Sequence, residues 1–367
     1  MVAIFTTASI LDNICHTDDL SVWQDMIVKL GEVFVDGDVD IPLDMEDPLF
    51  ILDSAIKIDD SKKEFITSIP NSPETVLQEP CGIFLLDISE QRASEIQSKY
   101  GVICQSPSSF DHNVLTQKGT SAELVEGMKD KTWSDIFKKF KNTPTNSALI
   151  IDEHLFENDQ YDERQGCYDK DRSYGINNLK NIIDQILPDT FADIYHIGIL
   201  LINTDEAKAK RRSRTSLTNA RIASAINKLK KKISRPYEIN IEVIFFSTDD
   251  DGHKLIHNRR ILTNTYVLDA PYKLAAFEPN GISRASQTIT VKPLFELIHI
   301  DTDSDMKEKR LRYDLDDFYG YIKTQCRAKS ASGQLYRNGS LVESFYQVKH
   351  RFLTKCRLMQ DDCTGGY

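Results

Sequence analysis

The residues best suited to chemistry are His257 and Arg259, in the stretch DDGHKLIHNRRILTNTYVLD. An arginine guanidinium presents a planar set of N–H donors that can hold two phosphate oxygens at once. In an extended chain, side chains two positions apart point to the same side. The stretch follows a predicted buried strand, and α/β proteins place functional groups at the carboxyl ends of their strands. The sequence therefore predicts a phosphate-binding site here, with Asn264 ordering the loop.

The spacing of His257, Arg259 and Asn264 resembles the phospholipase D superfamily signature, in which His-x-Lys is followed after four residues by Asp. The resemblance covers about residues 148–295. It implies one half of a two-half α/β fold, in which the histidine attacks a phosphodiester and the lysine holds phosphate oxygens. The chain is more similar still to the phospholipase D-like domain that follows microtubule-interacting-and-trafficking domains. That domain carries His-x-Arg, and the resemblance implies phosphate or membrane-lipid binding without hydrolysis.

The departures from that pattern leave three readings open. Asn264 lacks the charge that would orient a histidine and stabilise its imidazolium. The pattern occurs once, so hydrolysis would need a second histidine from a homodimer or from elsewhere in the chain. The site either binds phosphate without turnover or works as a dimeric phosphodiesterase. In the third reading, His257 and Asn264 only satisfy backbone groups of a turn.

A strongly basic segment precedes this stretch. Residues 207–235 hold eleven Lys or Arg and no Asp or Glu, whereas the whole chain has a net charge of −11. Such a segment predicts a local polyanion site or a docking surface for an acidic partner, or else a solvated helix face. The residues expected to attract an anion are Arg211, Arg212, Arg214, Lys230, Lys231 and Lys232.

The amino-terminal half offers an alternative site built on carboxylates. Asp12, Asp53 and Asp87 each follow an apolar stretch that reads as a strand. Converging carboxylates of this kind could hold Mg²⁺ in a nuclease, although an aspartate after a strand is also a common helix cap. The seven cysteines have no zinc-site spacing, and no phosphate-binding glycine loop is present, so neither a zinc site nor a nucleotide cofactor is predicted. The leading hypothesis includes no metal or other cofactor.

The periodicity predicts two α/β domains, since 367 residues exceed one ordinary core. Residues 1–110 form the first, with a helix at 21–30, a hairpin at 31–44 and a strand within PLFILDSAI. A strand–helix–strand unit over 82–104 favours parallel pairing. The remaining predicted regions are a polar linker with one helix (111–147), a phospholipase D-like α/β sandwich (148–305) and a helical carboxyl-terminal extension (306–367).

Composition narrows the function classes further. Apolar residues make up 40% and charged residues 28%, typical of a globular chain, and no run of apolar residues is long enough to span a membrane. Without a basic, apolar leader, we expect a cytoplasmic protein. The leading hypothesis is a binding or regulatory protein for nucleic acid or another phosphorylated ligand, within a multi-protein bacterial-type system. The two enzymes named above, partner-protein binding and a scaffold role remain alternatives.

Overall fold

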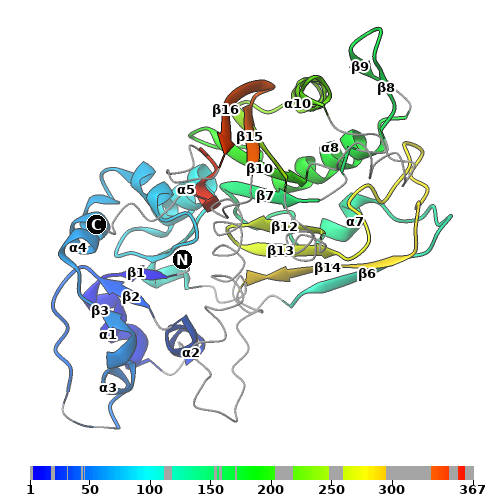
Figure 1. The fold of residues 1–367 in the computed structure, drawn as a ribbon. Coiled ribbons are helices and arrows are strands. Elements are labelled where there is room, and N and C mark those ends of the chain that lie inside the picture. The colour runs from blue at the N-terminus through cyan, green and yellow to red at the C-terminus, as the bar shows by residue number, and fades with distance from the viewer. Residues whose placement is uncertain are drawn as a thin grey trace.

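The computed structural model describes residues 3–17, 21–30, 32–42, 44, 46–110, 118–152, 155–156, 159–169, 172–202, 218–247, 259–294, 332–346 and 354–359. They form a mixed α/β structure with a five-stranded sheet, a nine-stranded sheet and a small two-stranded ribbon. Figure 1 shows the two large sheets beside one another, the amino-terminal one in blue to cyan. Among the described helices, none is long and apolar enough to cross a membrane.

The amino-terminal sheet is entirely parallel, with strand order β3-β2-β1-β4-β5. Apolar clusters cover both faces, one against α1, α2 and α3 and the other against α4 and α5. Helices on both faces of a parallel sheet make this a doubly wound unit. Its elements are β1 (Ile4–Thr6), α1 (Ala8–Cys15), α2 (Ser21–Leu30), β2 (Val33–Val35), α3 (Pro48–Leu52), β3 (Ile56–Lys57), α4 (Asp60–Ser68), β4 (Ile83–Leu85), α5 (Glu90–Tyr100) and β5 (Ile103–Gln105).

Several predictions for this unit are confirmed. Helix α2 has the predicted bounds, and α5 begins after Ser89, whose hydroxyl accepts from the backbone amide of Arg92. Strands β4 and β5 pair in parallel across that helix. The left-handed conformation of Gly101 (φ +61°) ends α5, a conformation that glycine adopts without a steric penalty.

Two predictions for the same unit are wrong. The expected hairpin over 31–44 is the single strand β2, which pairs in parallel with β1 and β3. Asp36, read as part of a hairpin turn, instead accepts from the Ala8 amide at the start of α1. The expected strand in PLFILDSAI is mostly helix α3, because Asp47 caps its amino terminus and Pro48 occupies its first position.

The larger sheet has the order β16-β15-β11-β10-β7-β12-β13-β14-β6. Its central strands β7, β10 and β11 are parallel, and antiparallel strands flank them on both sides. The elements of this unit are β6 (Thr120–Leu124), α7 (Trp133–Phe137), β7 (Ser147–Ile151), β8 (Tyr161–Asp162), β9 (Cys167–Tyr168), α8 (Tyr174–Ile186), β10 (Tyr195–Ile202), α10 (Asn219–Lys232), β11 (Ile239–Ser247), β12 (Arg259–Thr263), β13 (Tyr266–Ala270), β14 (Gln287–Pro293), β15 (Ser332–Arg337) and β16 (Ser340–Tyr346).

Helices α7, α8 and α10 pack on one face of this sheet and share its largest apolar cluster. On the other face, the short segment Thr354–Met359 packs against residues of β7, β10 and β11. The Glu242 carboxylate of β11, 1% exposed, accepts from the Thr354 hydroxyl and from the Lys355 and Cys356 amides. We call Thr354–Met359 the carboxyl-terminal strap.

Two segments of the second unit differ from expectation. Residues 111–147, expected to be a polar linker with one helix, do contain that helix as α7, but α7 and the strand β6 pack into the larger unit. Where it is described, the carboxyl-terminal extension has a 3-10 helix only at Arg357–Met359, and β15 and β16 instead form an antiparallel hairpin at the edge of the sheet. Its turn is Asn338-Gly339, both with positive φ, the conformation that a two-residue hairpin turn requires. The extension's residues 306–331 lie outside the described residues.

Candidate functional site

The start of β12 brings Arg259 beside a buried carboxylate. In the register of β12 with β7, Arg260 faces Ile151, so the next pair along the ladder is Arg259 and Asp152. Strand alternation directs both side chains to the helix-covered face, on which Ile150 and Ile261 also lie. Arg259 is 8% exposed and Asp152 is 2% exposed. Buried charges need partners, and this register places opposite charges on neighbouring strands.

Asp152 is also fixed from a second direction. Its Oδ2 atom accepts from the backbone amide of Leu274, at 3.2 Å, in the loop that follows β13. Ala270, the last residue of β13, pairs with Arg259. The loop after β13 therefore passes directly over the edge of the sheet at which Arg259 and Asp152 lie.

Two further cations belong to this loop. The Lys273 ammonium lies 3.5 Å from the carbonyl oxygen of Arg284, and the Arg284 guanidinium stacks at 4.0 Å on the ring of Tyr174. Burial lowers the pKa of Lys273, and the Arg284 charge lowers it further, whereas the Glu126 carboxylate opposes the shift. We call Asp152, Arg259, Lys273 and Arg284 the carboxyl-edge cluster, because the strands and the loop that carry them meet at this edge.

The amino terminus of α8 borders the same edge. The Asp159 carboxylate accepts from the backbone amides of Gly175 and Ile176, at 2.7 and 3.0 Å. Burial raises the pKa of Asp159 to about 6, while the two amides and the Arg284 charge oppose the shift. The first turn of α8 is thus neutralised by the protein's own carboxylate, and the cations beside it remain the groups suited to an external anion.

The three residues of the sequence motif have different outcomes. His257 lies outside the described residues. Arg259 is at the carboxyl edge, as expected. Asn264 lies just past the other end of β12, roughly 16 Å of extended chain away. Its side chain is 2% exposed, donates to the Gly101 carbonyl at 2.8 Å, and accepts from the Asn146 amide at 2.9 Å.

Asn264 therefore joins the two sheets. Asn146 completes the joint, since its side chain donates to the carbonyl of Pro80 at 2.8 Å. The expectation that Asn264 orders a phosphate-binding loop next to Arg259 is not supported by this placement, because the two residues lie at opposite ends of one strand.

Several cations of the basic segment bind other parts of the protein, and others lie outside the described residues. Arg221 makes two hydrogen bonds to one Glu163 oxygen and stacks at 5.0 Å on Tyr161 of the β8–β9 ribbon. Lys228 donates to the carbonyls of Tyr168 and Asp169. Of the predicted anion-binding residues, Lys232 contacts Asn177, Lys231 is exposed and Lys230 is half-buried. Arg211, Arg212 and Arg214 lie outside the described residues.

The amino-terminal carboxylates do not converge. Asp12 lies within α1 and Asp53 follows α3, so neither ends a strand, and Asp87 is exposed beyond β4. In the part of the chain that the structure describes, no group of three or more His, Cys, Asp or Glu could hold a metal ion. The structure thus offers no support for a magnesium nuclease built on these three residues.

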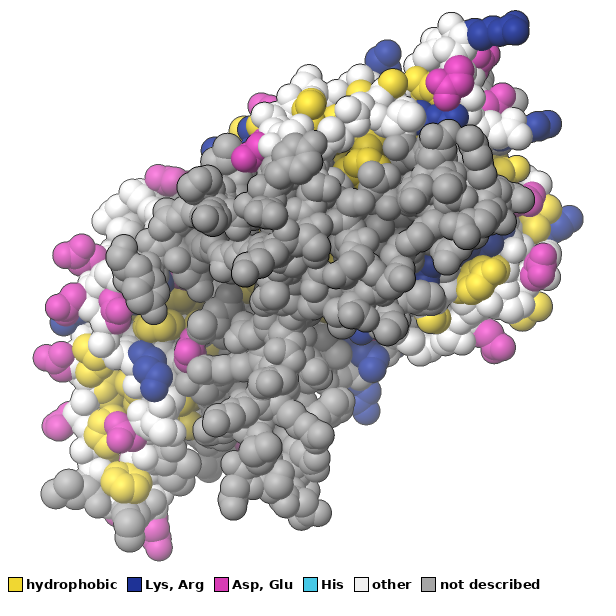
Figure 2. Space-filling view, in the orientation of Figure 1, with side chains coloured by type: hydrophobic (Ala, Val, Ile, Leu, Met, Phe, Trp, Pro, Cys, Tyr) yellow, Lys and Arg dark blue, Asp and Glu magenta, His cyan; other side chains and the backbone are white. Residues whose placement is uncertain are grey.

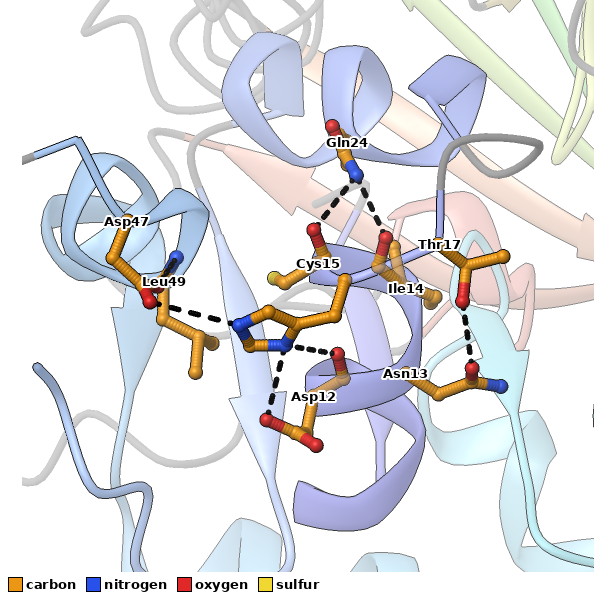
Figure 3. Close-up of polar contacts among 9 residues, drawn as sticks. Asp12, Asn13, Ile14, Cys15, Thr17, Gln24, Asp47 and Leu49 are labelled. Carbon is orange, nitrogen blue, oxygen red and sulfur yellow. Dashed lines mark hydrogen bonds and ion pairs between the residues drawn. The ribbon is translucent and has the colours of Figure 1, made fainter.

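Asp12 instead takes part in a histidine contact that the sequence analysis did not single out. The His16 ring contacts Asp12 of α1 and Asp47, the residue that caps α3, and Figure 3 draws these contacts as dashed lines to the two labelled aspartates. Nδ1 lies 2.9 Å from the Asp12 carbonyl oxygen and 3.3 Å from its carboxylate, and Nε2 lies 3.6 Å from the Asp47 carboxylate. The Asp12 backbone hydrogen bond is the main cause that raises the pKa of His16.

Sequence reasoning missed most of the carboxyl-edge cluster. Asp152 ends the apolar run ALIID, residues 148–152, which predicts a short buried strand, and its place at a strand end is the signal that points to it. Lys273 and Arg284 lie in a loop after β13 without a recognisable motif, and only the antiparallel return of β12 and β13 brings them to Arg259. No protein-family model matches this chain, and no curated protein matches it in sequence.

Proposed function

We propose that this protein binds a phosphodiester or phosphorylated ligand, foremost nucleic acid, at the carboxyl-edge cluster and acts as a binding or regulatory protein. The observation that carries the proposal is the burial of Arg259 at a sheet edge that Lys273 and Arg284 also border. Guanidinium and ammonium groups on strands and a loop that meet at one edge can together hold a phosphate. The likeness of His257 and Arg259 to a phosphate-binding pattern supports the same ligand class.

Salt-dependent binding tests the proposal. Fluorescein-labelled DNA and RNA are titrated with the full chain at several salt concentrations, and binding is read as anisotropy. Lys273→Gln with Arg284→Gln should weaken binding by about tenfold at low salt and reduce the slope of log affinity against log salt by about 1 to 2. Lys138→Gln with Lys141→Gln removes the same number of charges from two exposed lysines outside the cluster and is the matched control.

Arg259→Gln would leave Asp152 buried beside a neutral side chain and could unfold the protein, so circular dichroism accompanies that variant. The double variant at half-buried Lys273 and Arg284 does not share this difficulty. No salt-dependent binding by the unaltered chain would overturn the proposal. Cleavage that resists EDTA and disappears in His257→Ala would replace it with a histidine-dependent phosphodiesterase.

A further inference from the structure

Two tyrosine–cation pairs involve the loop that follows β13. The Lys273 ammonium lies 5.3 Å from the centre of the Tyr272 ring. The Arg284 guanidinium lies 4.0 Å from the Tyr174 ring, at the start of α8. In a third pair, Arg221 of α10 lies 5.0 Å from the ring of Tyr161 in the β8–β9 ribbon. Aromatic rings interleaved with basic side chains are the surface that single-stranded nucleic acids use.

Tyr272 is the ring of this series that faces solvent most openly. Its residue is 60% exposed, although large apolar side chains are usually covered. Figure 2 shows yellow apolar side chains next to dark-blue basic ones at several places on this face, with acidic groups interspersed among them. What distinguishes Tyr272 is its attachment to a loop that carries two cations of the carboxyl-edge cluster.

The backbone that carries Tyr272 is held in place by a buried side chain. The Gln287 carbonyl oxygen accepts from the amides of Tyr272 and Lys273, both at 3.1 Å, and its Nε2 donates to the Lys273 carbonyl at 3.0 Å. Gln287 is 9% exposed. Three hydrogen bonds from one side chain fix the backbone that carries the ring before any ligand binds. A loop that is already ordered loses less conformational freedom when it binds a ligand.

We infer that the ligand of the carboxyl-edge cluster is single-stranded nucleic acid, with an unpaired base stacked on Tyr272 and the flanking phosphates held by Lys273 and Arg284. This inference rests on the proposed function and narrows its ligand class. In a duplex, the faces of each base are covered by neighbouring base pairs. An exposed ring beside phosphate-binding cations therefore discriminates in favour of unpaired strands.

The test compares ligands that share phosphates but differ in their bases. Anisotropy is measured with single strands of about 16 nucleotides, as DNA and as RNA, with the matching duplex, and with an abasic strand of equal length. Tyr272→Ala should weaken binding of the base-bearing strands by about fivefold or more and leave the abasic strand unchanged. Tyr272→Phe should retain the affinity, because it keeps the ring. Phe50→Ala, which removes an exposed ring of the amino-terminal unit, is the control.

The outcomes separate this inference from the proposed function. If Tyr272→Ala has no effect, or if the abasic strand or the duplex binds as tightly as the base-bearing strand, the inference is overturned. The proposed function still stands in that case, provided that Lys273→Gln with Arg284→Gln weakens binding to every strand. If no strand binds in a salt-dependent manner, both fail.

Discussion

His16 links two elements through its ring, and the contact depends on its protonation. Asp12 and Asp47 approach the two ring nitrogens from opposite sides, at 3.3 and 3.6 Å (Figure 3). Cys15, the neighbouring residue, is buried, and desolvation, aided by the same two carboxylates, raises the pKa of its thiol to about 12. A positive ring here attracts both carboxylates, whereas a neutral ring keeps only its hydrogen bond to α1.

The raised pKa of His16 predicts a pH-dependent contribution to stability. The contribution should be fully present below the unfolded pKa of about 6.5 and should disappear as pH rises through the higher folded value. His16→Gln should therefore destabilise the protein at pH 5.5 more than at pH 8.5, as read from urea unfolding. NMR titration gives the pKa directly, and Asp12→Asn should lower it. A His16 pKa at or below 6.5 would contradict this prediction.

Residue identity and spacing predicted Arg259 as a candidate but misplaced Asn264. Each residue of an extended strand advances the chain by about 3.3 Å, so Arg259 and Asn264 lie at opposite ends of β12. At its end of the strand, Asn264 donates to the carbonyl of Gly101, which is 163 residues away in the sequence. Nothing in the local pattern encodes that partner. Asp152 was available to sequence reasoning, but its place opposite Arg259 depends on the register of two strands that are more than 100 residues apart.

At the scale of elements, strongly periodic segments were predicted well, and short or ambiguous ones were not. Sequence periodicity predicts helices over 177–187 and 217–232 and strands over 194–203 and 237–246. Helices α8 and α10 and strands β10 and β11 lie close to those ranges. The Asn338-Gly339 turn is a strong hairpin signal that the expectation of a helical extension overlooked. A short apolar run such as PLFIL fits a strand or a helix equally well, and only its Asp-Pro start distinguishes them.

The end of α5 gives an element-scale prediction. A Cβ on residue 101 would lie 1.9 Å from the Thr145 carbonyl oxygen, and the backbone there is left-handed. Gly127 is also left-handed, at φ +85°, but a Cβ there meets nothing within 4 Å. Backbone strain should lower the free energy of unfolding by roughly 1 to 2 kcal/mol in both Gly101→Ala and Gly127→Ala. In Gly101→Ala the free energy of unfolding should fall further, because the Thr145 carbonyl must move away from the new Cβ.

Urea unfolding of the two variants gives the comparison. The difference between their losses isolates the clash with Thr145 from the cost of the left-handed backbone. Equal losses would mean that the close approach between α5 and the segment before β7 does not contribute to stability.

At the scale of the whole molecule, two buried polar contacts tie distant parts of the chain together. Asn146 and Asn264 join the amino-terminal unit to the larger sheet through the carbonyls of Pro80 and Gly101. Arg357 of the carboxyl-terminal strap donates to the carbonyls of Asn146 and Ile194 and pairs with Asp193 at 2.7 Å. Through Arg357 and Asn146, the carboxyl-terminal strap therefore contacts the place where the amino-terminal unit meets the larger sheet.

Glu242 is the residue on which the strap depends. Besides the strap's hydroxyl and amides, its carboxylate accepts from Arg337 Nε of β15 at 2.7 Å. The substitution Glu242→Gln removes a charged acceptor and points an amide N–H₂ at these donors. Hydrogen bonds to charged groups contribute about 1.5 to 3 kcal/mol each, so local opening of the strap should become at least tenfold more frequent.

Cys356 reports that opening. Its thiol is fully buried, and burial raises its pKa to about 12, so it should react with a thiol reagent only when the strap leaves the sheet. Mass spectrometry of labelled peptides measures the rate at which Cys356 reacts, with exposed Cys167 as the internal standard. We expect Glu242→Gln to accelerate labelling of Cys356 by tenfold or more, and Glu238→Gln, at an exposed position, to leave it unchanged. Equal labelling in Glu242→Gln and the unaltered chain would show that the carboxylate does not hold the strap.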